Sequence, residues 1–475
     1  MDLPRIPKNN HSYSIGVIVE EIQRHLYIAI PTILRYLFFV LSDCFYIALV
    51  GRFDSMPVSH FAGANMGMML VNVTGLSLGI GFAGAIGPFV SQEYGTGRVK
   101  RSGFHLLNFA QCAIVIFLFS FLASNTSEFL LVAMGQDPEV AANVQTYARI
   151  AVWALPGQML VKALQQVLDA QRDVVPGLAV DVIGALLQVP VCWLVLKSGG
   201  GFSGAAYVKV FVNTLIGLIL VSWIHCSDRG MRVWSLPIDE RPASMWLFLK
   251  QAIPNTFATC IEWWAQEFIA LLAGLLPHAS LTVASNGVLF NCAVVFYMTW
   301  VGSKNAMATR VGNLIGSGRC HEVPRAAAVG LGLCVVEIVL AILLGWHYRH
   351  DIVSMFTANP ELQSMVLQTW STMLLVLVPY SFTFMLFGIL SGAGLQDTVA
   401  YVFLASLVLG MPFGVYLTFV LNYSLDGLWI GNGLFFGIAG FVLLIKVLQI
   451  DWSSKQMLEH EQHYIMIDED PSAGA

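Results

Sequence analysis

The chain has 475 residues, of which 57% are apolar and only 11% are charged, and its formal net charge is −5. Soluble globular domains carry about 25% charged residues, so this chain has too few charges to cover a water-exposed surface. Its eight cysteines stand singly, without the CxxC or Cys/His spacing of a zinc site or the pattern of a disulfide framework. We therefore expect an integral membrane protein surrounded by a lipid bilayer, with no metal site and no bound nucleic acid.

Twelve apolar stretches are long enough to cross a membrane, since a helix needs about 20 mostly apolar residues to span the hydrocarbon core. The fourth and tenth stretches contain several polar residues and are the weakest of the set. The pattern predicts an all-α polytopic membrane protein with twelve transmembrane helices. The approximate spans are 26–50, 62–88, 104–124, 144–168, 174–197, 204–226, 252–276, 281–303, 326–346, 364–390, 399–421 and 427–449.

The basic residues are distributed unevenly over the two sides of these spans. If the N-terminus is cytoplasmic, 17 of the 24 Lys and Arg residues fall on the cytoplasmic side and three fall outside. Cytoplasmic loops of membrane proteins are enriched in Lys and Arg, so we expect both termini in the cytoplasm, in a plasma membrane or an endomembrane. Four basic residues lie within spans, and we expect the last three of them to extend toward the membrane interfaces. They are Arg35, Arg149, Lys162 and Lys209.

The two halves of the chain resemble each other at an offset of about 222 residues. Pro31 matches Pro254, and the turn 95–98 (GTGR) matches 316–319 (GSGR). Each half holds six spans, so the halves share one orientation and form two six-helix pseudo-symmetric lobes, a design in which transporters place the substrate path between the lobes. One chain supplies both lobes, and we expect it to act as a monomer. The predicted segments are a cytoplasmic N-terminus (1–25), an N-lobe (26–226), a cytoplasmic linker (227–247), a C-lobe (248–450) and a disordered cytoplasmic tail (451–475).

Several stretches resemble those of one transporter family. Residues 260–267 (CIEWWAQE) resemble the seventh-span motif of eukaryotic multidrug and toxic compound extrusion (MATE) transporters. Residues 71–79 (VNVTGLSLG), which include Asn72, are similar to their second span. Residues 310–316 (RVGNLIG) are similar to their loop after span eight, and residues 388–394 (GILSGAG) to the end of their tenth span. The resemblance covers about residues 24–450.

The resemblance implies a secondary antiporter that exports organic cations or amphipathic xenobiotics and metabolites by alternating access between two lobes. The proton is the usual coupling ion of eukaryotic members, and we expect it here rather than sodium. The family's first seventh-span glutamate maps onto Glu262, which is implied to bind the proton and a cationic substrate competitively. The sequence holds no HExxH motif, Ser/His/Asp array or P-loop, so we expect no enzymatic activity and no cofactor, and an ion gradient as the energy source.

The chemistry of a carboxylate in mid-membrane agrees with this role for Glu262. Such a group costs ~2.5–3.5 kcal/mol on insertion scales and is a functional hypothesis by default, because burial disfavours its charged form. A carboxyl group that holds a proton in one state and a cation in another is the simplest physical basis for antiport. Glu267 is a second candidate, but it lies about 140° around the helix from Glu262, so the two cannot face one ligand. Trp263 could stack on a flat cation.

The sequence departs from the family pattern at two acidic positions. The acid that animal and plant members often carry in span ten corresponds to Tyr380, and the span-eight glutamate of some animal members corresponds to Asn291. These neutral residues argue against a strong preference for divalent organic cations and are compatible with the exchange of one proton. Asp43 in span one and Glu337 in span nine are further intramembrane carboxylates and therefore further candidates.

Other functions remain open at this point. An exporter of organic anions or secondary metabolites would use Arg35, Arg149 and Lys162 along its path. A flippase for lipid-linked precursors tends to have extra spans or a hydrophobic side groove, so the twelve-span count argues against it. A receptor or scaffold would need a signalling domain, and the tail after residue 451 is too short for one.

Overall fold

The computed structural model describes residues 15–52, 58–96, 101–133, 138–227, 244–277, 279–356 and 359–452. Every regular element in these ranges is a helix. In the first half of the chain the elements are α1 (Ile15–Arg52), α2 (Val58–Val71), the π-helical turn η1 (Asn72–Leu76), α3 (Ser77–Gly84), α4 (Ile86–Thr96), α5 (Ser102–Ala133), α6 (Pro138–Ala151), the 3₁₀ turn η3 (Val152–Ala154), α7 (Leu155–Ala170), α8 (Val175–Lys197) and α9 (Gly201–Cys226).

The second half repeats this all-helical pattern, and the predicted all-α polytopic fold is confirmed. Each predicted span lies on one of the helices or on a composite of consecutive ones. The short α13 is an addition that the apolar runs do not predict. The elements are α10 (Met245–Ala273), α11 (Ala279–Gly316), the 3₁₀ turn η5 (Cys320–Glu322), α12 (Val323–His347), α13 (Arg349–Phe356), α14 (Pro360–Gly392), α15 (Gln396–Phe419) and α16 (Ser424–Gln449).

Ten helical stretches in the described ranges are long and apolar enough to cross a membrane. The two predicted spans outside this set are the fourth, which η3 divides into α6 and α7, and the seventh, which is α10. Both carry polar side chains along their length. The predicted tenth span, by contrast, has a mean hydropathy of 2.2 over its most apolar window, and its inward-facing polar residues are buried by neighbouring helices.

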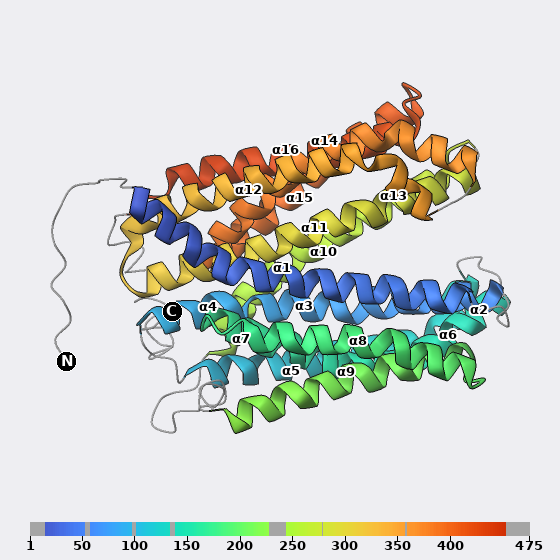
Figure 1. The fold of residues 1–475 in the computed structure, drawn as a ribbon, viewed down its shortest axis with the longest axis horizontal. Helices are drawn as coiled ribbons and strands as arrows, with labels where there is room; N and C mark the ends of the chain where they lie inside the picture. The colour runs from blue at the N-terminus through green and yellow to red at the C-terminus, as the bar shows by residue number, and fades with distance from the viewer. Residues whose placement is uncertain are drawn as a thin grey trace.

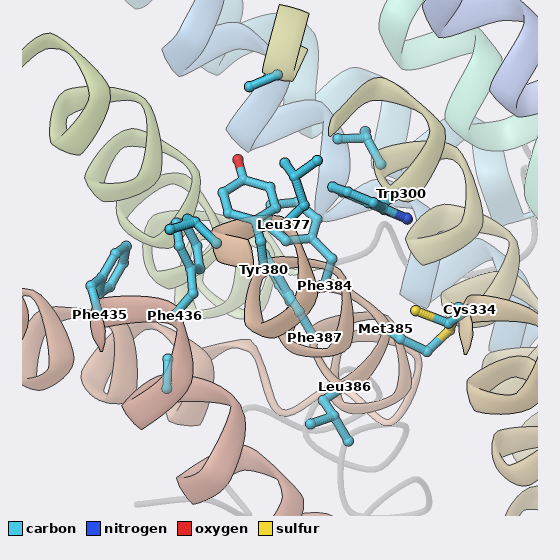
Figure 2. Close-up of a cluster of buried hydrophobic side chains, with 14 of the residues drawn as sticks. Trp300, Cys334, Leu377, Tyr380, Phe384, Met385, Leu386, Phe387, Phe435 and Phe436 are labelled. Atoms are coloured by element: carbon cyan, nitrogen blue, oxygen red, sulfur yellow. The ribbon is translucent and has the colours of Figure 1, made fainter. Parts of the chain in front are cut away.

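Figure 1 shows two groups of helices side by side, with α1 running between them. We call α2–α9 the first helix group and α10–α16 the second helix group. Each has its own apolar core, and in the second group aromatic rings of α11, α14 and α16 pack together (Figure 2). The lobe limits stay a prediction, and most of the predicted linker, the first 14 residues and the last 23 lie outside the described residues.

The two helix groups are in direct contact on the side where α1 begins and α16 ends, which we call the terminal side (Figure 1). There α4 packs on α11 so closely that a Cβ on Gly316 would lie 2.0 Å from the Gln92 carbonyl oxygen. Asn255 of α10 also donates to the Gly81 carbonyl of α3 at 2.6 Å. These contacts hold the groups together on the terminal side.

Candidate functional site

Glu262 lies near the middle of α10 with only 3% of its surface exposed. Two tyrosine hydroxyls donate hydrogen bonds to the same oxygen, Oε1. Tyr297 reaches it from α11, and Tyr380 reaches it from α14 at 3.4 Å. The Tyr380 ring belongs to the aromatic cluster of Figure 2, and its hydroxyl lies at the edge of that cluster. Three helices of the second group therefore converge on one carboxyl group.

A cavity of about 470 Å³ lies beside Glu262, and both helix groups and α1 line it. Its walls are largely aromatic and apolar, with neutral amides interspersed. Such a mixture is typical of small-molecule sites, where a few polar groups orient a mainly apolar ligand. The sequence-predicted residues that line it are Asp43, Asn72, Glu262, Trp263, Asn291 and Tyr380.

A second, smaller chamber of about 70 Å³ adjoins Glu262 toward the terminal side. Glu262 and Trp263 line both spaces. Two lysines of opposite helix groups, Lys162 and Lys304, also line the smaller chamber, and both ammonium groups lie over aromatic rings. The Lys162 Nζ is 4.6 Å from the Phe39 ring centroid, and the Lys304 Nζ is 4.5 Å from that of Phe387. The smaller chamber therefore has lysine side chains in its lining, which the larger cavity lacks among its described residues.

Asp43 lines the cavity, but Lys209 already neutralises its charge. Lys209 Nζ is 3.1 Å from Asp43 Oδ1, and Gln188 Nε2 donates to the same oxygen at 2.9 Å. Lys209 is 3% exposed, so the expectation that it extends to a membrane interface is wrong. The same correction applies to Lys162, which is buried 3.8 Å from Asp181. Pairing a buried cation with a carboxylate offsets part of the desolvation cost that an interface position would avoid.

Arg35 is likewise buried, and its guanidinium group forms two hydrogen bonds to Asp169 at 3.0 and 2.7 Å. It is not among the residues that line the two cavities. Arg149 is also not among them, and it donates to the Asn125 carbonyl at an exposed position. Of the three cations expected along an anion path, only Lys162 lines either of these two cavities.

The structure does not bring Glu337 to either cavity. Glu337 lies on α12, and its carboxylate accepts a hydrogen bond at 2.8 Å from the Oγ of Ser303 on α11. Val335, Val336 and Val339 of α12 are exposed, because this helix lies at the periphery of the second group. Glu267 lies on α10, but its side chain is outside the part that the structure describes.

Sequence reasoning missed Tyr297 and Lys304, both on α11. They are seven residues apart, which places both on one helix face. The predicted span ended at residue 303, whereas α11 continues to Gly316. Extending the helix period past the apolar run would have placed Lys304 on the same helix face as Tyr297, which lies inside the predicted span.

Comparisons with known proteins agree with this architecture. The sequence profile of the MatE family matches residues 31–194 and 254–416, which together exceed half of the chain. The chain is 28% identical to Protein DETOXIFICATION 1 of Arabidopsis thaliana over 90% of this chain and 89% of that protein. It is 30% identical to Multidrug and toxin extrusion protein 1 of Danio rerio over 83% of this chain and 67% of that protein.

Solved structures share the fold. A crystal structure of the eukaryotic MATE transporter AtDTX14 superposes with a TM-score of 0.87 and 24% identity, covering 94% of this chain and 99% of that one. An outward-facing multidrug resistance MATE family transporter gives a TM-score of 0.80 at 14% identity, covering 96% of this chain and all of that one. The chain therefore belongs to the MATE family of multidrug and toxin extrusion transporters and is not an enzyme.

Proposed function

We propose that this transporter exports organic cations or amphipathic compounds in exchange for protons, and that proton and substrate compete for Glu262. The observation that carries the proposal is the position of Glu262. Its buried carboxyl group stands where the large cavity meets the smaller chamber, and it accepts hydrogen bonds from Tyr297 and Tyr380. Hydroxyl donors stabilise an ionised carboxylate that burial would otherwise disfavour, so both protonation states are within reach.

The cavity walls fit a monovalent, partly apolar cation. Aromatic rings such as those of Phe290, Trp263 and Trp429 line the cavity and can stack on a flat or cationic group. The carboxylates among its described lining residues are Glu262 and Asp43, and Lys209 pairs with Asp43. Among these lining residues, Glu262 is thus the carboxylate without a lysine or arginine at ion-pair distance. It can bind one proton or balance one positive charge of a substrate. The substrate can drive the conformational change only as far as its affinities for the two states differ.

Transport by the purified protein in sealed liposomes tests this proposal. A labelled organic cation and an imposed pH gradient are used with the parent, with Glu262→Gln and with Glu361→Gln, which removes an exposed carboxylate at the start of α14. We expect gradient-driven movement with the parent and Glu361→Gln, and the background of empty liposomes with Glu262→Gln. Unchanged transport by Glu262→Gln would assign coupling to another group. Movement driven only by a sodium gradient would identify sodium, and not the proton, as the coupling ion.

Export of organic anions or secondary metabolites is a second candidate because Lys162 and Lys304 line the chamber beside Glu262. The larger cavity would then hold the apolar body of the substrate. Lys304 would balance the charge of the substrate, since Lys162 already lies 3.8 Å from Asp181. The same liposomes loaded with a labelled organic anion distinguish the candidates. Transport of the anion that Lys304→Met reduces, without transport of the cation, would favour the second one.

A further inference from the structure

A pocket of about 400 Å³ lies on the terminal side and shares no lining residue with the two cavities at Glu262. Three separate parts of the fold form it: the first turns of α1, the connection between α7 and α8, and α11. Each part contributes one arginine to the lining. These arginines are Arg24, Arg172 and Arg310.

The carboxylates around this pocket are already engaged with two of the arginines. Glu20 contacts Arg24 at 2.5 Å, and buried Glu21 receives two hydrogen bonds from Arg310 at 2.6 and 2.7 Å. Arg172 has no carboxylate partner among the described residues, and its guanidinium carbon lies 6.0 Å from the Tyr94 ring centroid. The pocket therefore carries one positive charge that the surrounding described carboxylates do not balance.

Two nitrogen atoms of these arginines lack hydrogen-bond partners. They are Arg172 Nε and Arg310 Nη1, both buried within the described structure. Arg310 itself is 1% exposed and lines the pocket. Burial and the neighbouring charge of Arg310 lower the pKa of Arg172, which is the direction expected for clustered cations that lack an anion. Buried donors of this kind are normally satisfied, so a ligand with several acceptor oxygens fits them.

The backbone at Arg172 also indicates a role for its side chain. Its φ angle is 62°, in the left-handed region that glycine adopts far more readily than arginine. Backbone hydrogen bonds from Arg172 to Asp169 and from Asp173 to Leu168, both at 2.9 Å, fix this turn. The turn therefore presents a guanidinium group at a position where the backbone alone would favour glycine.

An exposed apolar stripe on α1 continues directly from this pocket. Tyr27 lines the pocket with 60% of its surface exposed, and Ile30 and Leu34 follow on the same helix face and are also exposed. An aromatic residue followed by exposed aliphatic residues is the pattern of a helix that passes from the membrane interface into the hydrocarbon. A ligand in the pocket could therefore have its acyl chains along α1.

We propose that this pocket binds a phosphate group, supplied by an anionic phospholipid, between Arg24, Arg172 and Arg310. Guanidinium groups bind phosphate oxygens through paired, charge-assisted hydrogen bonds, which suits the unpartnered nitrogens. The bound phosphate would contact α1, the first helix group through Arg172 and the second helix group through Arg310. A ligand that binds one conformation and not the other stabilises the conformation that it binds by mass action. The lipid would therefore favour the conformation in which the two helix groups are in contact on the terminal side.

Native mass spectrometry of the full-length protein, released from detergent, tests the phosphate site. Phosphatidic acid is titrated against phosphatidylcholine as the neutral-lipid control, and glycerol 3-phosphate carries the same head group without acyl chains. We expect saturable binding of phosphatidic acid and none of the other two. Comparable binding of glycerol 3-phosphate would keep the phosphate site and overturn the lipid as its source. If neither phosphatidic acid nor glycerol 3-phosphate binds saturably, the proposed phosphate site is wrong.

Three variants separate the pocket from general surface charge. Arg172→Gln and Arg24→Gln each remove one pocket cation, whereas Lys446→Gln removes an exposed cation near the end of α16. We expect both pocket variants to bind phosphatidic acid about tenfold more weakly, as the loss of one charge-assisted contact requires, and Lys446→Gln to bind like the parent. An equal loss of phosphatidic acid affinity in all three variants would mean that the lipid is attracted by the overall positive charge of the surface and not by this pocket, and it would overturn the proposal. Melting temperatures of the three variants show whether each is folded.

Discussion

The neutral partners of Glu262 define its chemistry at the scale of single residues. Two hydroxyls donate to one carboxylate oxygen, and neither would carry a charge at neutral pH. Tyr380 stands where the family resemblance gives an acid, so the site has a donor in place of a second group that competes for the proton. If Glu262 binds the proton and the substrate as proposed, this arrangement favours the exchange of one proton for one positive charge.

Removing the Tyr297 hydroxyl is expected to weaken the binding of an organic cation. Tyr297→Phe deletes a donor to the ionised carboxylate, and a hydrogen bond to a charged group contributes about 1.5–3 kcal/mol, so affinity should fall about tenfold or more. Tyr401→Phe removes a hydroxyl from an exposed tyrosine on α15 and should bind like the parent. Equilibrium binding of a labelled cation at fixed pH measures both. Equal affinities in all three proteins would separate Tyr297 from substrate binding.

The sequence could identify site residues that lie on a motif or at its aligned position, and Glu262, Trp263 and Tyr380 are of this kind. It could not identify Lys209 as the partner of Asp43, because 166 residues separate the two and only the packing of both α1 and α9 against α8 brings them together. For the same reason the sequence could not identify Tyr297 as a site residue, because its role follows from its hydrogen bond to Glu262 on another helix. Long-range pairing is set by helix packing, and a single sequence read by itself carries little information about which residues pair.

At the scale of elements, apolar runs locate membrane spans but not helix ends. The predicted eighth span covers 281–303, whereas α11 runs from Ala279 to Gly316 and stops before Gly318, whose φ of 69° ends the helix in the left-handed region. The extra turns of α11 form the contact with α4 on the terminal side. Lipid exposure selects apolar residues only along part of a helix, so hydropathy does not report a contact made beyond the membrane core.

Gly316→Ala is expected to destabilise the contact between α4 and α11. The new Cβ would lie 2.0 Å from the Gln92 carbonyl oxygen, so the two helices must move apart, and overpacking of this kind costs about 1–3 kcal/mol. Gly332→Ala on α12 places a Cβ with nothing within 4 Å and gains helix propensity, so it should leave stability unchanged or raised. Melting temperatures in detergent report both effects. A Gly316→Ala protein as stable as Gly332→Ala would mean that the terminal-side contact contributes little to stability.

At the scale of the whole molecule, the two halves share one site. The MatE profile matches the chain twice, once in each half, as the internal repeat led us to expect. The cavity takes Asp43 and Asn72 from the first half and Glu262 and Tyr380 from the second. Neither half encloses the site alone, because its walls are the facing surfaces of the two helix groups.

A chain divided between residues 235 and 236 should therefore reassemble into a working transporter. The cut falls in the predicted linker, and the Glu21–Arg310 ion pair and the Asn255–Gly81 hydrogen bond would join the fragments across their interface. We expect proton-driven transport in liposomes that hold both fragments and none with either fragment alone. Introducing Glu262→Gln into the second fragment should abolish the recovered transport, which excludes a contaminating exporter. Transport by the second fragment alone would show that the path does not need the first helix group, and the two-lobed mechanism would have to be abandoned.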